Sequence, residues 1–296
     1  MRLWKATQIY LNSKSYCNLS ASSQKFYESN LRRINKTLIG GKPFANKSIN
    51  SMTIETCVEA YDTWEQESST STANHLARVF SVVANHMIML EKINRNPMKF
   101  VKKRQSKPRS VVWTQDQVIT FLDAAYSKFE WRNIGLIVQM CYEWGQRPVD
   151  IRNLTFDQID WLKRKVDITQ TKRGSEVELP IPSELYPMLK QQHEDWGFQE
   201  YVVPLHRPQD NAYRPFTVSN MTSYLKEVKA HCGLPDELQV GDLRKTAITE
   251  LIESGVDSLQ IQSVTGHKNV RSLDPYNKFS FDTAKAALDR RKSYVL

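Results

Sequence analysis

The sequence has few cysteines and histidines, and none of them stand at spacings that bind a metal ion. The six histidines are dispersed, and the four cysteines lie far apart, at Cys17, Cys57, Cys141 and Cys232. No HExxH motif and no Cys-His cluster is present. Isolated cysteines without a disulfide framework favour reduced thiols and a cytosolic setting. We therefore expect chemistry that uses no metal.

Glycine-rich nucleotide motifs and long apolar runs are also missing. Only 10 of the 296 residues are glycines, and they form neither a P-loop nor a dinucleotide fingerprint. No apolar run approaches the roughly 18 residues that span a membrane. The first residues, MRLWKATQIYLNSKSY, lack the apolar stretch of a secretory signal. The sequence thus predicts a cytoplasmic protein that needs neither ATP nor any other cofactor, and that has no membrane partner.

Positive charge is concentrated in the N-terminal third. The chain carries a net charge of +9, and residues 1–108 hold 17 Lys and Arg against 7 Asp and Glu. The densest stretch, NRNPMKFVKKRQSKPR at 94–109, has seven cations and no acid. A polyanion is the natural partner of such a block, although a solvated linker can also be lysine-rich. The candidate DNA contacts in this stretch are Lys99, Lys102, Lys103, Arg104, Lys107 and Arg109.

The N-terminal third is predicted to be a small helical bundle. Apolar residues recur at helical spacing in three runs, which start after Ser20 and at about residues 53 and 72. Glycine is scarce, and the alternating pattern of a strand is absent. The basic stretch contains Pro97 and Pro108 and is predicted to be a linker. We therefore expect two domains, 1–108 and 109–296.

The second domain is predicted to combine helices with a small antiparallel β-meander. Thr114-Gln-Asp-Gln117 resembles a capping box, and a second helix is expected over about 131–142. Three β-prone runs follow, at about 156–159, 166–170 and 176–180. Helices are expected again near 217–231, 242–254, 257–264 and 282–291. The predicted fold class is mainly α with a small antiparallel meander.

Five polar residues stand out in this second domain. They are Arg147 in GQRPVDI, Lys172 in a predicted hairpin, Arg244 in DLRKTA, His267 after Gly266, and Tyr276 nine positions after that histidine. Each has an ordinary structural explanation when it is taken alone; Arg147, for example, can pair with Asp150. Any one of them by itself would more often be structural than functional.

Together, and in this order, these residues resemble the tyrosine recombinases of the phage integrase family. The segment GQRPVDIRNLTFDQID (145–160) is similar to the first arginine box, and ITQTKRGSEVELPIP fits the hairpin lysine segment. The segment DLRKTAITELIESGVDSLQIQSVTGH (242–267) fits the second arginine box up to the Gly-His turn. The resemblance implies a core-binding, SAM-like helical domain followed by an α+β catalytic domain of the DNA breaking-rejoining type. We expect no further arm-binding module ahead of it.

The resemblance also implies a mechanism. Tyr276 would attack a phosphodiester and form a 3′-phosphotyrosyl link, while Arg147 and Arg244 bind the non-bridging oxygens. Lys172 would protonate the leaving 5′-oxygen, and His267 would hydrogen-bond the phosphate. Asp150 is expected to orient a neighbour. The partners implied are duplex recombination sites, a homotetramer on DNA, and accessory DNA-bending or directionality proteins in a prokaryotic cell.

Two positions depart from the family pattern. A histidine commonly stands three residues before the second arginine, where this chain has Gly241; His231, Lys245 or a water could take its place. Pro275 directly precedes the tyrosine, and Asp274 could cap a helix that starts there.

Several alternatives remain open at this point. The task could be integration and excision of a mobile element, chromosome-dimer resolution or inversion. A DNA-binding protein that has lost cleavage, and a type IB topoisomerase, are the rivals of other classes. Tyr294 is a rival nucleophile, and the C-terminal helix could pack on its own domain or on a neighbouring protomer.

Overall fold

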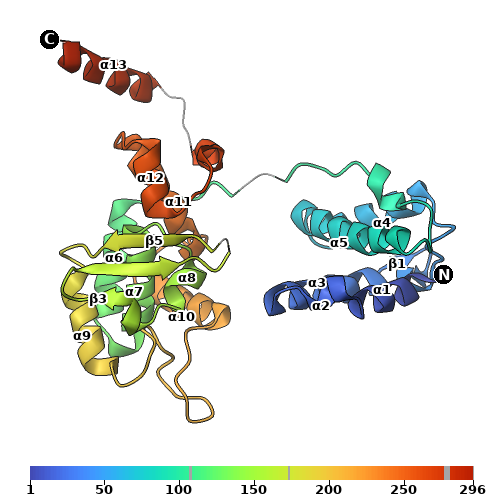
Figure 1. The fold of residues 1–296 in the computed structure, drawn as a ribbon, viewed down its shortest axis with the longest axis horizontal. Coiled ribbons are helices and arrows are strands. Elements are labelled where there is room, and N and C mark those ends of the chain that lie inside the picture. Colours follow the sequence, from blue (N-terminus) through green and yellow to red (C-terminus); the bar gives the residue numbers. More distant parts are fainter. Residues whose placement is uncertain (107–108, 173, 277–280, 296) are drawn as a thin grey trace. The chain divides into compact units, whose positions relative to one another are not determined.

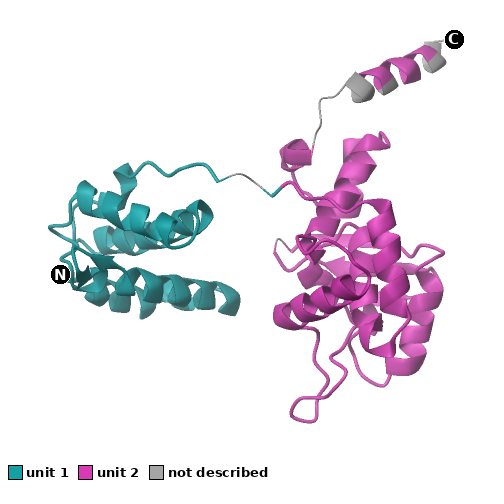
Figure 2. Cartoon of the chain, turned by 180° about the vertical axis from the view of Figure 1, so that it is seen from behind, with its two compact units in different colours: residues 1–109 teal, residues 110–296 magenta. Residues whose placement is uncertain are grey.

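The chain forms two compact units, Met1–Arg109 and Ser110–Leu296 (Figure 2). The sequence predicts this boundary one residue earlier, after residue 108. The computed structural model describes residues 1–106, 109–172, 174–276 and 281–295. No helix among these residues is long and apolar enough to cross a membrane.

Unit 1 is a helical bundle around α5, which contacts α1, α3 and α4 (Figure 1). Its helices are α1 (Leu3–Leu11), α2 (Lys14–Cys17), α3 (Ala21–Lys36), α4 (Ile54–Gln66) and α5 (Thr70–Met89), with the 3-10 helices η1 (Phe44–Asn46) and η2 (Pro97–Phe100). Side chains cap α3, α4 and α5 at Ser20, Thr53 and Ser69. The predicted helical bundle also contains a short hairpin that the sequence pattern does not predict: β1 (Leu38–Ile39) and β2 (Lys42–Pro43) pair across Gly40-Gly41, where both glycines adopt positive φ.

The start of the linker is fastened to unit 1. The Arg104 backbone N–H donates to the Tyr61 hydroxyl, and the Arg104 carbonyl accepts from the Asn74 amide, both at 2.9 Å. The Arg104 guanidinium pairs with Asp62 at 2.8 Å and with Glu65. Arg104 therefore anchors the chain where it leaves the bundle.

Unit 2 is built around α7 (Phe129–Glu143), which contacts α6, α8, α10 and α11 (Figure 1). Its other helices are α6 (Gln115–Tyr126), α8 (Pro148–Arg152), α9 (Tyr186–Trp196), α10 (Val218–His231), α11 (Val240–Glu253), α12 (Ser258–Thr265) and α13 (Phe281–Val295), with the 3-10 helices η3 (Phe156–Gln158) and η4 (Val270–Tyr276). The capping box at Thr114 is present as predicted. Nearly all of α7 is buried from Trp131 to Cys141, so it is the core helix of this unit.

The predicted antiparallel meander is confirmed, and only its first strand is shorter than predicted. β3 (Ile159–Asp160), β4 (Lys165–Thr169) and β5 (Glu176–Pro180) lie in that order, and Val166 pairs with both Ile159 and Leu179. The predicted strand at 156–159 is wrong for its first three residues, which form η3, because Thr155 and Gln158 make a capping box there. Val166 and Ile168 face the core, which gives β4 its alternation.

The C-terminal segments differ most from the prediction. Tyr276 does not begin a helix capped by Asp274; it ends η4, with Pro275 inside that 3-10 helix. Proline lacks a backbone N–H, and a 3-10 turn at this position tolerates that loss. The buried side chain of Leu273 packs η4 against α11 and α12. The tail helix α13 starts one residue before the predicted Asp282 and extends to Val295, which includes Tyr294.

Candidate active site

Arg147 lies where the chain turns from α7 into α8. Gly145 has φ 57°, which lets the backbone turn sharply after Trp144, and Arg147 then precedes Pro148 at the first position of α8. The Arg147 Nη1 donates to the Gln170 Oε1 at 2.9 Å and lies 3.8 Å from the Asp150 carboxylate. A fifth of the side chain is exposed, so the remaining guanidinium donors can reach a ligand.

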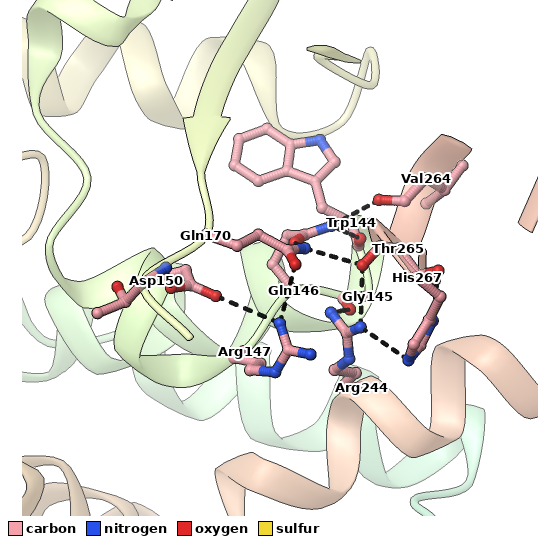
Figure 3. Close-up of polar contacts among 11 residues, drawn as sticks. Trp144, Gly145, Gln146, Arg147, Asp150, Gln170, Arg244, Val264, Thr265 and His267 are labelled. Carbon is pink, nitrogen blue, oxygen red and sulfur yellow. Dashed lines mark hydrogen bonds and ion pairs between the residues drawn. The ribbon is translucent and has the colours of Figure 1, made fainter. Parts of the chain in front are cut away.

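Arg244 reaches the same place from the first turns of α11 (Figure 3). Its Nη1 donates to the Gly145 carbonyl at 3.0 Å, and its Nη2 donates to the Thr265 carbonyl at 2.9 Å. The Nη2 also lies 3.2 Å from the His267 Nε2. These contacts come from the α7–α8 connection and the end of α12. The guanidinium of Arg244 therefore joins segments that are about a hundred residues apart in sequence.

His267 is buried and its tautomer follows from its neighbours. Gly266 ends α12 in the left-handed conformation, with φ 69°. This turn directs the His267 ring toward Arg244. The Thr265 hydroxyl donates to the Ile261 carbonyl at 2.6 Å, so it accepts from the His267 Nδ1 at 2.7 Å. The ring is then a neutral imidazole whose Nε2 accepts from Arg244.

The two arginines influence each other electrostatically. Burial, and after it the positive charge of Arg147, lower the pKa of Arg244 to about 10. The charges of Tyr276 and Asp150 act in the opposite direction. Arg244 remains cationic at neutral pH, but its hydrogen-bond partners are neutral groups. Two cations close together, one of them buried, form a site that favours an anion.

Two buried glutamines that the sequence analysis missed connect this site. Gln170, at the end of β4, donates through Nε2 to the Gln146 Oε1 at 2.7 Å and to the Thr265 carbonyl at 2.8 Å. Gln146 donates to the carbonyls of Trp144 and Val264. Glutamine has no titratable group, so neither residue stands out as a catalytic candidate. The only signal in the sequence is position: Gln146 directly precedes Arg147, and Gln170 stands two residues before Lys172.

Tyr276 packs at the edge of this site. Its half-buried side chain lies against the small cluster of Ile248, Ile261 and Leu273, which joins α11, α12 and η4. Its phenol is close enough to Arg244 to raise the pKa of that arginine. The structure thus brings four predicted residues into one neighbourhood: Arg147, Arg244, His267 and Tyr276.

Lys172 is not in contact with this group. It is exposed in the turn between β4 and β5, next to Arg173, which lies outside the described residues. Asp150 reaches the same turn: its Oδ1 accepts from the Thr171 N–H at 2.8 Å, and its Oδ2 is buried. This contact agrees with an orienting role for Asp150, because it holds the hairpin onto α8.

Gly241 leaves open space at the position where the resemblance expects histidine. A Cβ added there would have no neighbour within 4 Å, and the residue lines a hollow of about 620 Å³ between α8, α10 and α11. Of the substitutes considered, His231 lies against Trp131, with ring centroids 4.9 Å apart. That contact places its ring on α7 rather than beside Arg244.

The basic residues predicted to bind DNA lie on or after η2. Lys99, Lys102 and Lys103 are exposed, Arg104 is paired with two carboxylates, and Arg109 is exposed at the end of unit 1. Lys107 lies outside the described residues. Among the described residues, no group of three or more His, Cys, Asp and Glu side chains could hold a metal ion.

Replacing Gly266 by alanine is expected to destabilise unit 2 more than replacing Gly174. Both glycines have positive φ, which costs alanine about 1–2 kcal/mol. A Cβ at Gly266 would also lie 2.6 Å from the Gln170 Nε2, whereas one at Gly174 meets nothing within 4 Å. Urea unfolding of Gly266→Ala and Gly174→Ala measures the difference, and equal losses would show that Gln170 does not hold Gly266 closely.

Comparison with known proteins gives a match to one protein family. Residues 112–282 match the model of the phage integrase family, which is more than half of the chain. A tyrosine recombinase of Thermosipho africanus is 21% identical over 281 residues, covering 90% of this chain and 95% of that protein.

Two solved structures have the same fold. The Tn1549 transposon integrase in complex with a circular intermediate DNA covers 98% of this chain and 99% of that chain, with 18% identity and a TM-score of 0.78. A lambda integrase tetramer bound to a Holliday junction covers 95% of this chain and 80% of that chain, with 18% identity and a TM-score of 0.74.

Proposed function

The chain belongs to the phage integrase family of tyrosine-type site-specific recombinases, and we propose that it cleaves and rejoins DNA through a 3′-phosphotyrosyl intermediate formed on Tyr276. One observation carries the proposal. Arg147 and Arg244 meet beside His267 and Tyr276, and Arg244 is buried on neutral partners. A phosphate between the arginines adds a negative charge where Arg244 has only neutral hydrogen-bond partners.

The first step is attack of the Tyr276 phenol oxygen on the phosphorus of the scissile diester. A bond forms between that oxygen and phosphorus, the bond to the 5′-oxygen breaks, and the phenol proton is lost to solvent. Negative charge grows on the non-bridging oxygens, where the donors of Arg147 and Arg244 stabilise the transition state. Rejoining reverses the step, and since the phosphotyrosyl bond retains the energy of the diester, strand exchange needs no ATP.

Lys172 and His267 have separate roles in this mechanism. Lys172 protonates the leaving 5′-oxygen, which requires the β4–β5 turn to approach the DNA because the lysine is exposed there. The His267 Nε2 accepts from Arg244 in the present structure. In the proposed step this nitrogen carries a proton and donates a hydrogen bond to a phosphate oxygen.

Unit 1 and the linker supply contacts to the DNA backbone. Their excess positive charge fits phosphate contacts, which position the protein without reading sequence. Lys99, Lys102, Lys103, Lys107 and Arg109 are the proposed contacts. Arg104 also belongs to this stretch, but its guanidinium already holds the linker to α4, so it contributes chiefly by fixing the exit of the chain.

Replacing Lys102 and Lys103 by glutamine is expected to weaken DNA binding and to reduce its salt dependence. Each lost phosphate contact lowers the slope of log K against log salt by about 0.9, so the double variant should lose about 2. Fluorescence anisotropy at several salt concentrations measures the slope. Lys163→Gln, in the exposed turn between β3 and β4, is the control and should keep the wild-type slope.

The working assembly is proposed to be a homotetramer on two DNA duplexes in the cytoplasm of a prokaryotic cell. The lambda integrase that shares this fold is a tetramer on a Holliday junction. On α13, Ala284, Ala287 and Leu288 are exposed, and an apolar face of this kind fits contact with a neighbouring protomer. Accessory DNA-bending or directionality proteins belong to the same proposal.

Integration and excision of a mobile element is the proposed task, and resolution of chromosome dimers or inversion is the alternative within the same chemistry. The test uses DNA fragments from both flanks of the gene. A protein–DNA adduct that survives denaturant, and that forms with EDTA present and no ATP, supports the function. Tight and site-specific binding without an adduct supports a DNA-binding protein that has lost cleavage.

A further inference from the structure

Gln170 occupies the centre of the polar network between the two arginines. Its Oε1 accepts from Arg147, and its Nε2 donates to Gln146 and to the Thr265 carbonyl. That same carbonyl accepts from Arg244 at 2.9 Å. One fully buried amide thus connects the arginine of α8 with the carbonyl that holds the arginine of α11 (Figure 3).

The orientation of this amide is determined by its neighbours. Gln146 is also fully buried, and its Nε2 donates to two backbone carbonyls, so its Oε1 can only face Gln170 as an acceptor. The Gln170 Nε2 must therefore point toward Gln146, and its Oε1 must point toward Arg147. Every polar atom of both side chains has a partner, and the pair cannot flip without leaving buried groups unsatisfied.

The backbone around Gln170 is held equally firmly. Its N–H donates to the Ser175 carbonyl and its carbonyl accepts from the Gly174 N–H, both at 2.8 Å, which closes the turn that contains Lys172. Gly266 lies against the amide so closely that a Cβ would be 2.6 Å from the Gln170 Nε2. The side chain therefore has one available position.

We propose that Gln170 is a positioning residue that sets the spacing and orientation of the Arg147 and Arg244 guanidinium groups, so that both bind the non-bridging oxygens of one phosphate in the transition state. The inference rests on the proposed function and deepens it. The two cations repel each other, and a neutral amide fixes their positions without neutralising either one. A carboxylate in this place would pair with Arg147 and compete with the phosphate.

The test is single-turnover cleavage of a nicked suicide substrate by Gln170→Met, which keeps the side-chain size and removes all three hydrogen bonds. The rate at saturating DNA is expected to fall about 10- to 100-fold, as for a misplaced catalytic group. The DNA concentration for half-maximal rate should stay within about threefold of wild type, because the loss is in the transition state.

A second readout isolates the contact with the phosphate. Substrates with sulfur in place of one non-bridging oxygen keep the charge but weaken the hydrogen bond from a guanidinium. Wild type should cleave one diastereomer more slowly than the oxygen substrate. In Gln170→Met that ratio should shrink at least about threefold. An unchanged ratio, or a wild type indifferent to both diastereomers, would overturn the proposal.

Gln192→Met is the matched control. Gln192 is another fully buried amide of unit 2, and its Nε2 donates to the Asn133 side chain and the Val202 carbonyl, both at 2.7 Å. It should lower the melting temperature as Gln170→Met does and leave the cleavage rate below that temperature unchanged. An equal rate loss in both variants would mean that Gln170 acts only through stability.

If Gln170→Met does not fold, Gln170→Glu replaces it in both measurements. Glutamate keeps the side-chain volume and an oxygen that accepts from Arg147. Its negative charge should slow cleavage and shrink the same sulfur ratio; wild-type values of both would contradict the proposal. Failure of the proposed function is distinguishable, because wild type itself would then form no adduct on its site.

Discussion

Replacing Tyr276 by phenylalanine is expected to abolish the covalent protein–DNA adduct while leaving DNA affinity within about threefold of wild type. The phenol oxygen is the proposed nucleophile, and phenylalanine keeps the ring that packs against Leu273, Ile248 and Ile261. Cleavage should therefore fall by at least about 10³-fold without loss of fold. The measurement is adduct formation on a nicked suicide substrate in a denaturing gel, with affinity measured on intact DNA.

Tyr294→Phe is the control for this experiment, because Tyr294 lies in α13 and is the rival nucleophile. This variant should form the adduct at the wild-type rate. An adduct that persists in Tyr276→Phe and disappears in Tyr294→Phe would move the nucleophile to α13. If wild type binds its confirmed site and makes no adduct, Gly241→His is the variant to test next, and it should restore cleavage. A histidine side chain has room there, because nothing lies within 4 Å of a Cβ added at Gly241.

Replacing Arg244 by lysine is expected to slow cleavage by about 10²- to 10³-fold. The planar guanidinium reaches the Gly145 carbonyl, the Thr265 carbonyl and His267 at once, and still has donors left for a phosphate. A lysine ammonium is a point charge with three donors, and it cannot span these partners. Single-turnover cleavage at saturating DNA measures the loss, and circular dichroism checks the fold.

Arg214→Lys is the matched control for charge and size. Arg214 is exposed, and its partner Asp210 lies 3.8 Å away on the surface of unit 2. This variant should cleave at the wild-type rate, since an exposed ion pair contributes little. Cleavage by Arg244→Lys within threefold of wild type would exclude the proposed role of Arg244 in binding the phosphate.

The lowered pKa of Arg244 also links this site to stability. Burial and Arg147 lower that pKa to about 10, so the folded protein releases the proton at a lower pH than the unfolded chain does. The contribution of this group to the free energy of unfolding therefore rises with pH above about 10, and at neutral pH the buried charge is a cost. The phosphate that we propose to bind beside Arg244 would offset that cost and stabilise the protein.

The sequence alone determined the elements that carry the candidate residues. Helical periodicity and caps predicted α6, the helices around Arg244 and the turn at Gly266, because these signals are local. The β-prone run at 166–170 predicted β4, and the order of the motifs indicated the family. The short strands at Gly40-Gly41 and the end of η4 at Tyr276 were not predicted, because two-residue strands and 3-10 turns depend on neighbouring segments for their stability.

The tertiary structure decided how the candidate residues meet. No periodicity relates Gln170 to Arg147, or Arg244 to the carbonyls of Gly145 and Thr265, since these pairs are 21 to 99 residues apart. Their contact requires α8 and α11 to pack on α7, and α12 to pack on α11 and β5. Burial then forces each polar atom to find a partner. The sequence determined which polar groups are present. Packing determined that the buried Gln170 amide accepts from Arg147 and donates to the Thr265 carbonyl, which also accepts from Arg244.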